Sequence, residues 1–222
     1  MEAPSSGILL ISDPFLKDPN FQRTVILLCE HMVEGSFGFV LNKPHKGVVG
    51  DYVADLDGCQ FPVFKGGPVQ KDSIHFIHRC PDQLGGVEII DGIYWGGDFV
   101  EVIKGIKAEE IDQTEIRFFI GYSGWGEGQL EGELEEKSWI VRDGNKRLIF
   151  MKQVDQIWKE SLKDLGGEYQ QMPNYPLDPQ LNYSVPLPRA GGVAAGRGGY
   201  PLLGGAPIPI HRESAGRVTP QF

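Results

Sequence analysis

The chain has 222 residues, enough for one large domain or two small ones. Its apolar content of 41% and charged content of 23% are ordinary for a soluble globular protein, and no run of about 18 apolar residues predicts a transmembrane helix. The first apolar run, Ile8 to Ile11, is too short for a signal-peptide core. The three widely spaced cysteines argue against a disulfide framework. We therefore expect a cytoplasmic protein with no membrane association.

The charge is unevenly distributed along the chain. Residues 1–183 hold 17 of the 21 Lys and Arg residues but 29 of the 30 Asp and Glu residues, which is a net charge of −12. A surface this acidic repels phosphate backbones, and the sequence shows no concentrated basic patch. Direct binding of nucleic acid is therefore not expected.

The N-terminal half is predicted to consist mainly of strands. The segment 24–31 is apolar at nearly every position, which is typical of a strand covered on both faces. The turn-like residues 34–36 then favour a hairpin with the next strand. Strands are expected at residues 8–12, 24–31, 37–42, 63–65 and 73–79.

The C-terminal half mixes helices with strands. Asp91-Gly92 predicts a two-residue hairpin between strands at 87–90 and 93–95, and Asp98 is a suitable N-cap for a helix that reaches Ile106. The remaining expected elements are a strand at 116–122, a helix at 126–137, a strand at 138–141 and a helix at 154–165. Because strands occur in runs and do not alternate strictly with helices, an α+β fold is favoured over a doubly wound sheet.

The composition changes abruptly near Tyr183. Residues 184–222 contain six prolines, eight glycines and no lysine, and they show no helical or strand periodicity. Such a segment buries too little apolar surface to offset its chain entropy. We therefore predict one domain at residues 1–182, followed by a tail at 183–222 that is disordered or not native to the protein.

The most informative stretch is FFIGYSGWGEGQL at residues 118–130, in which an apolar strand runs into a glycine-rich segment. Five further motifs precede it in the chain: GILLISDP (7–14), DPNFQRTV (18–25), LCEH (28–31), GFVLNKP (38–44) and GGPV (66–69). In this order the motifs resemble those of the bacterial YqgE/AlgH family, over roughly residues 7–182. The resemblance implies a β-barrel-like or bifurcated mixed sheet flanked by helices. Members often carry a transcriptional-regulator label, but the family has no settled biochemical function.

The tripeptide Cys29-Glu30-His31 is the first candidate for chemistry. On a regular strand, Cys29 and His31 would share one face and Glu30 the other, beside Ile26 and Leu28. The Cys/His pair could activate a thiolate, although neighbours on one strand face do not have the geometry of a nucleophile and its base. Glu30 would belong either to a structural polar network or to the rim of a pocket.

The glycine-rich segment is the second candidate. A turn opening a helix at 126 would leave backbone N–H groups free for an anion or polar ligand, with Trp125 as an aromatic wall. The alternative is close packing of a helix on a strand, which glycine permits. If both regions line one pocket, its residues are Asp13, Arg23, Glu30, Asn42, Gly66, Gly67, Ser123, Trp125, Gly126 and Gln129.

Catalytic and metal motifs are incomplete in this sequence. Residues 121–125 lack the second glycine of a G-x-S-x-G elbow, the cysteines lack C-x-x-C spacing, and no cofactor motif is present. We therefore expect no catalytic residues, no metal and no cofactor. The favoured function is a non-catalytic regulatory or interaction protein that binds a protein partner or a small ligand. The alternative is an enzyme that uses the carboxylates of Asp13 and Glu30 around an aromatic pocket.

Overall fold

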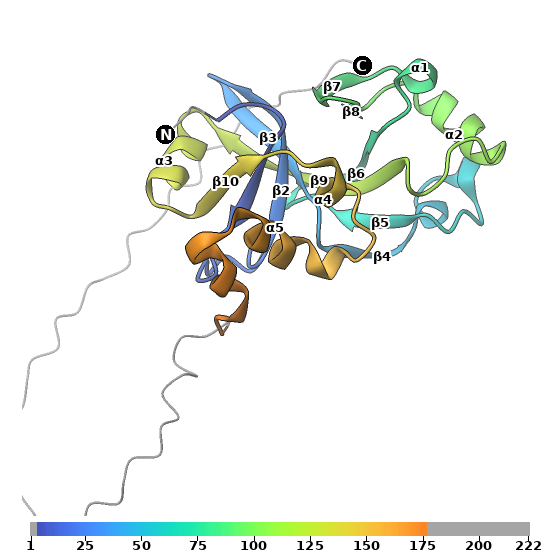
Figure 1. The fold of residues 1–222 in the computed structure, drawn as a ribbon. Coiled ribbons are helices and arrows are strands. Elements are labelled where there is room, and N and C mark those ends of the chain that lie inside the picture. Colours follow the sequence, from blue (N-terminus) through green and yellow to red (C-terminus); the bar gives the residue numbers. More distant parts are fainter. Residues whose placement is uncertain (1–3, 177–222) are drawn as a thin grey trace, which may run out of the picture. The chain divides into compact units, whose positions relative to one another are not determined.

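The computed structural model describes residues 4–176 of the chain, and the predicted tail at 183–222 lies outside these described residues. The described part is a mixed α+β domain in which a curled, mainly antiparallel sheet forms a half-barrel with a few helices around it (Figure 1). It forms one compact unit. The predicted single-domain α+β fold with a barrel-like sheet is therefore confirmed.

The sheet follows the order β10-β1-β2-β3-β9-β6-β8-β7, with β5 also paired to β9, and β4 to β5. The strands are β1 (Ile8–Ser12), β2 (Val25–Met32), β3 (Gly35–Val40), β4 (Pro44–Val48), β5 (Pro62–Lys65), β6 (Val69–His78), β7 (Val87–Ile90), β8 (Ile93–Trp95), β9 (Ile116–Gly126) and β10 (Trp139–Asp143). The α-helices are α1 (Pro81–Leu84), α2 (Phe99–Lys107), α3 (Gln129–Glu135), α4 (Lys146–Ile149) and α5 (Ile157–Leu165). Short 3₁₀ helices are η1 (Val49–Asp51), η2 (Ala54–Leu56), η3 (Val154–Gln156) and η4 (Gly167–Asn174).

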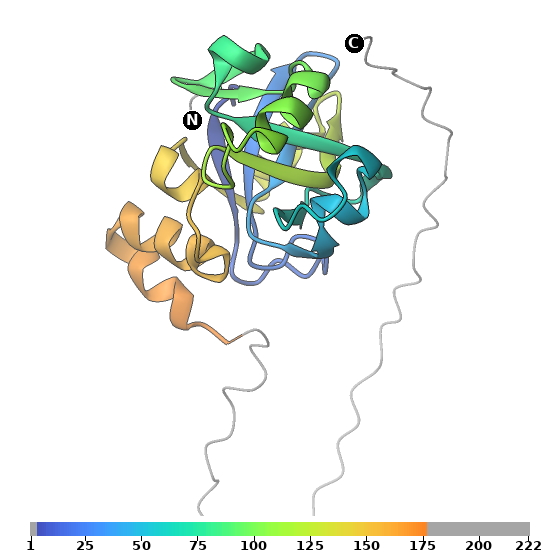
Figure 2. The same cartoon turned by 90° about the vertical axis from the view of Figure 1, so that its right-hand side faces the viewer.

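Strands β1 and β2 are covered on both faces, as their continuous apolar runs predict. One face of β2 carries Leu27, which packs in a core with Trp158 and Leu162 of α5. The other face carries Ile26, which packs with Leu130 of α3. Helices α5 and α3 therefore bury their apolar sides on opposite faces of the same strands. Helix α2 covers a third hydrophobic core elsewhere in the domain (Figure 2).

Strand β9 joins the two parts of the sheet. Its first half lies between β6 and β5, pairing antiparallel with β6 and parallel with β5. Its second half pairs with β3 as far as Gly126. The neighbour changes near Gly121, whose φ of +68° suits glycine because it has no Cβ atom.

Two predicted boundaries in this region are wrong. The strand does not end at Tyr122 but continues through the glycines to Gly126, because Gly35 to Gly38 of β3 provide a continuing ladder of partners. The helix begins at Gln129, not at residue 126. Trp125 is therefore a strand residue. Within residues 4–176, no helix is both long and apolar enough to cross a membrane.

Candidate functional site

A β-bulge in the β2–β3 hairpin changes where the Cys29-Glu30-His31 side chains point. Leu28 and Glu30 pair with successive residues of β3, so Cys29 is the extra residue. A bulge places two residues of one strand opposite a single partner. Cys29 and Glu30 therefore share the face of Phe37, the partner of Glu30, while His31 turns to the other face. The expectation that Cys29 and His31 share a face is wrong, because the bulge interrupts the alternation.

The surroundings of Cys29 do not favour a thiolate. The side chain is buried, and burial, with a smaller contribution from the negative charge of Glu30, raises the pKa of the Cys29 thiol well above its ordinary value. His31 instead contacts the hydroxyl of Ser36, at 2.7 Å from Nδ1 to Oγ. The Cys/His pair is therefore not assembled for nucleophilic chemistry.

Glu30 and Trp125 lie on opposite faces of the sheet. Trp125 pairs with Ser36, which in turn pairs with His31, so these three side chains share one face. Glu30 pairs with Phe37 and therefore projects from the other face. The single pocket that would contain both residues does not form.

Trp125 belongs to a hydrogen-bond network between β9, α3 and β10. The indole N–H groups of Trp125 and Trp139 both donate to Oε2 of Glu133, at 2.9 and 2.7 Å. Gln129 donates to the other carboxylate oxygen at 3.0 Å and accepts from the backbone N–H of Gly126 at 3.1 Å. These polar groups are matched within the protein, as expected of a structural network that anchors a short helix.

Asp13, Arg23 and Asn42 lie at the opposite end of β2 from Glu30. The Asn42 amide accepts from the N–H of Val25 at 3.0 Å and donates to the carbonyl of Arg23 at 2.8 Å. Asp13 accepts from the backbone two residues later, within its own turn. Val25 and Glu30 are five residues apart, or roughly 16 Å along a strand. The carboxylates of Asp13 and Glu30 therefore do not converge.

The Arg23 side chain contacts two aromatic residues, Trp158 and Tyr175. Its φ is +52°, and its guanidinium lies over the Trp158 ring, 5.0 Å from the centroid. It also donates to the carbonyl of Tyr175. The indole of Trp158 donates to the carbonyl of Ser12 at 3.0 Å. These contacts tie η4 and α5 to the end of β1.

Gly66, Gly67 and Ser123 permit close packing of β5 on β9. A Cβ atom on Gly66 would lie 2.1 Å from the carbonyl oxygen of Gly121, and one on Gly67 would lie 2.2 Å from the backbone of Tyr122. The Ser123 hydroxyl is buried and donates to the carbonyl of Gly66 at 3.0 Å. Glycine is therefore required at both positions, because a larger residue would collide with the backbone of β9.

The ten predicted pocket residues therefore fall into separate places. Asp13, Arg23 and Asn42 form part of one end of the sheet; Gly66, Gly67 and Ser123 form the β5–β9 contact; Trp125, Gly126 and Gln129 belong to the α3 network; and Glu30 stands on the opposite face from Trp125.

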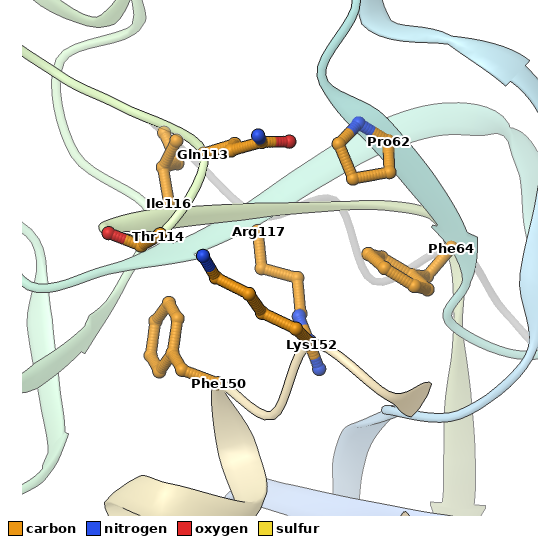
Figure 3. A pocket seen from close by; sticks show the side chains of 8 residues that line it. All are labelled: Pro62, Phe64, Gln113, Thr114, Ile116, Arg117, Phe150 and Lys152. Carbon is orange, nitrogen blue, oxygen red and sulfur yellow. The ribbon is translucent and has the colours of Figure 1, made fainter. Parts of the chain in front are cut away.

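A concave site lies elsewhere, between β5, the start of β9 and the loop after α4. It is a cleft of about 180 Å³ that combines two aromatic rings, an arginine and a lysine with polar side chains (Figure 3). The lining residues are Pro62, Phe64, Gln113, Thr114, Ile116, Arg117, Phe150 and Lys152.

Arg117 is the buried charge of this cleft. Only 7% of the residue is exposed. Its guanidinium donates to the carbonyl of Met151 at 2.8 Å and to that of Leu41 at 3.4 Å. Its central carbon lies 4.6 Å from the Phe64 ring centroid and 6.0 Å from that of Phe150. Within the described residues, no carboxylate forms a salt bridge with Arg117.

Positive charges outnumber negative ones around the cleft. Burial, and secondarily the charge of Arg79, lowers the pKa of Arg117 to about 10, so the guanidinium stays protonated at neutral pH. Arg79 lies 4.0 Å from the Phe150 centroid, and Lys152 lines the cleft. The nearby carboxylate of Asp112 accepts from the hydroxyl of Thr114 at 2.6 Å. No group of metal-ligating side chains occurs in residues 4–176.

The DUF179 model, described as AlgH-like, matches residues 9–170. The chain belongs to the AlgH-like family. It is 45% identical over 177 residues to a UPF0301 protein from Chlorobium limicola, covering 79% of this chain and 95% of the relative. It is 42% identical over 180 residues to a UPF0301 protein from Cytophaga hutchinsonii, covering 80% and 99%.

Solved structures show the same fold. The crystal structure of a protein from Corynebacterium diphtheriae aligns with a TM-score of 0.64 at 22% identity, covering 77% of this chain and 92% of that one. The solution structure of the AlgH protein from Pseudomonas aeruginosa aligns with a TM-score of 0.62 at 24% identity, covering 79% and 97%. At these identities the likeness establishes the fold alone.

The sequence interpretation missed the cleft in this AlgH-like chain. One signal was present: Arg117 interrupts the apolar run of β9, and a charge within such a run needs a partner. The contribution of Phe150 and Lys152 had no such signal, because it depends on how the loop after α4 packs against β9.

Proposed function

We propose that this AlgH-like protein is a non-catalytic regulatory or interaction protein that acts by binding a small ligand in the Arg117 cleft. The observation that supports this proposal is the lining itself. Aromatic walls with a few converging polar groups are typical of ligand sites. Arg117, Thr114 and Gln113 can orient a ligand, whereas the carboxylates of Asp13 and Glu30 lie far apart on the sheet.

We propose that the protein works in the cytoplasm, without direct contact with nucleic acid. Cys29, Cys59 and Cys80 are all unpaired thiols, which fits a reducing compartment. The net charge of −12 over residues 1–183 opposes nonspecific attraction to phosphate backbones. Any regulatory effect would then pass from the occupied cleft to a protein partner.

A ligand screen on the full-length ¹⁵N-labelled protein tests the proposal. Small polar and aromatic compounds are added singly, and we expect the amide shifts that respond to centre on Phe64 and Arg117. Gln113→Trp places a bulky side chain at the lining and should suppress these shifts. Gln171→Trp, an exposed position on η4, is the matched control and should leave them unchanged. Hits that bind elsewhere, or a compound that the protein converts, would contradict the proposal.

A further inference from the structure

The Arg117 cleft contains more positive charge than the described part of the protein neutralises. Arg117 is buried, yet its hydrogen-bond partners are two carbonyl oxygens and no carboxylate. Desolvating a guanidinium is unfavourable unless it is paired, and buried arginines are normally matched with acidic groups. Here the missing partner would have to come from outside the described residues.

The Arg117 guanidinium has N–H donors left for an anionic partner. An arginine carries five N–H donors in a planar fork, and the hydrogen bonds to Leu41 and Met151 use two of them. The Phe64 and Phe150 rings hold the group without consuming donors, because a ring face attracts a cation through its π electrons. A guanidinium fixed in this way is preorganised for carboxylates and phosphates, whose oxygen atoms match its fork geometry.

The neighbouring positive charges also favour an anionic ligand in the cleft. The guanidinium groups of Arg79 and Arg117 both lie near the Phe150 ring, at 4.0 and 6.0 Å from its centroid. Lys152 also lines the cleft (Figure 3). None of these three cations forms a salt bridge within residues 4–176.

Two acidic residues, Asp112 and Glu115, adjoin the lining residues in sequence. The carboxylate of Asp112 accepts from the N–H and hydroxyl of Thr114, at 2.5 and 2.6 Å; these hydrogen bonds lower its pKa, and the positive charge of Lys152 contributes to the same lowering. The carboxylate of Glu115 accepts from the backbone N–H of Asp112 at 3.1 Å. The two carboxylates therefore offset only part of the positive charge of the three cations.

The size of the cleft limits the ligand. A volume of about 180 Å³ is below the range of roughly 300–1,000 Å³ that is usual for drug-sized ligands. The volume of the cleft therefore suits a compact oxyanion better than a drug-sized ligand.

From these observations we infer that the Arg117 cleft binds a compact oxyanion, a carboxylate or a phosphate, through the guanidinium of Arg117 with assistance from Lys152. This inference rests on the proposed function, because it assigns the ligand class of the same cleft. Arg117 makes the charged hydrogen bonds, Lys152 adds a positive charge at the mouth, and the two phenylalanine rings exclude water from one side of the ligand.

The test is a titration of the full-length ¹⁵N-labelled protein at constant ionic strength. The probes are inorganic phosphate, acetate, and acetamide as an uncharged analogue of acetate, with chloride as the ionic control. We expect phosphate or acetate to shift the Arg117 side-chain Nε resonance and the amides of the cleft with saturation, and chloride and acetamide to give no saturable shift. The relative affinities of phosphate and acetate identify which oxyanion the site prefers.

Variants separate the proposed contacts from general electrostatics. Arg117→Lys keeps the charge but removes the fork, and it should weaken binding by about tenfold or more. Lys152→Gln removes an exposed charge and should weaken binding by about two- to fivefold without affecting folding. Lys71→Gln makes the same charge change at an exposed position on β6, at the opposite end of that strand from the pairing with Ile116, and should have no effect.

The outcomes distinguish this inference from the proposed function. If acetamide shifts the cleft residues and the oxyanions do not, the cleft is a ligand site but the oxyanion assignment is wrong. If the oxyanion shifts appear elsewhere, or respond equally to Lys152→Gln and Lys71→Gln, the assignment is also overturned. Should Arg117→Lys fail to fold, the comparison of Lys152→Gln with Lys71→Gln still decides the question.

Discussion

The α3 network and the Arg117 cleft place polar side chains against aromatic rings in opposite ways. In the network, the carboxylate of Glu133 receives two indole N–H groups and an amide, so donors and acceptor match. In the cleft, a buried guanidinium faces rings and carbonyl oxygens without a carboxylate. The first arrangement is complete within the protein, whereas the second has no counter-charge within residues 4–176, and we propose that a bound anion supplies it.

The two regions show that unusual residues in a sequence do not by themselves mark a binding site. The tryptophan and glycines of residues 118–130 draw attention because such residues are unusual together, yet they serve strand pairing and helix anchoring. Arg117 is a single charge in an apolar strand and draws little attention. Its burial without a carboxylate partner calls for an explanation, and this feature is visible only in the folded structure.

The largest effect is expected from removing the shared acceptor of the α3 network. Glu133→Ala leaves two indole N–H groups without their carboxylate and should lower the free energy of unfolding by about 3 kcal/mol, since hydrogen bonds to charged groups contribute more than neutral ones. Urea unfolding measures the change. Glu135→Ala, at an exposed position on the same helix, is the control and should change stability by less than about 0.5 kcal/mol.

The same variant should leave oxyanion binding at the Arg117 cleft unchanged. A folded Glu133→Ala protein that loses binding would show that the two regions are coupled and that the α3 network is part of the site. Equal unfolding energies for Glu133→Ala and Glu135→Ala would instead show that the indole bonds contribute little.

Most of the fold could be predicted from the sequence because its signals are local. The apolar run of residues 24–31 predicts a strand buried on both faces, and the Asp91-Gly92 pair predicts a hairpin. The N-cap at Asp98 was also predicted, and its carboxylate accepts from the N–H groups of Val100 and Glu101. Periodicity, turn chemistry and capping act over a few residues, so one sequence is enough to identify them.

The candidate site could not be predicted because it depends on register and bulges. One extra residue, Cys29, inverts the faces of Glu30 and His31, and nothing in the tripeptide distinguishes a bulge from a regular strand. The glycines at 124 and 126 predict a turn when the segment is considered alone, whereas pairing with β3 keeps them extended. In both cases the deciding factor is a partner strand whose pairing cannot be read from the segment itself.

A smaller effect is expected at Asn42, another predicted pocket residue with matched polar contacts. Asn42→Leu removes the bridge between the N–H of Val25 and the carbonyl of Arg23 and leaves both without this partner, so stability should fall by about 2 kcal/mol. Asn42→Asp keeps the acceptor and should lose less. Thermal unfolding ranks the two variants. If Asn42→Leu is as stable as the wild type but fails to bind phosphate and acetate, Asn42 belongs to the ligand site and the matched-network interpretation is wrong.

The smallest effect on stability, and the sharpest contrast, is expected at Arg117. The pKa of Arg117, lowered by burial to about 10, means that folding disfavours the protonated form by roughly 3 kcal/mol. Because the pKa is lowered in the folded state, the buried charge opposes folding below pH 10, and this penalty decreases as the pH rises above 10. Arg117→Met removes this penalty along with the carbonyl bonds and ring contacts, and a methionine can fill the space between the rings. The two changes oppose each other, so the free energy of unfolding in urea at neutral pH should stay within about 1 kcal/mol of the wild type, while oxyanion binding is lost.

A loss of several kcal/mol in Arg117→Met would show that Arg117 is a structural residue whose contacts outweigh the cost of its burial. The cleft and the α3 network would then be the same kind of arrangement.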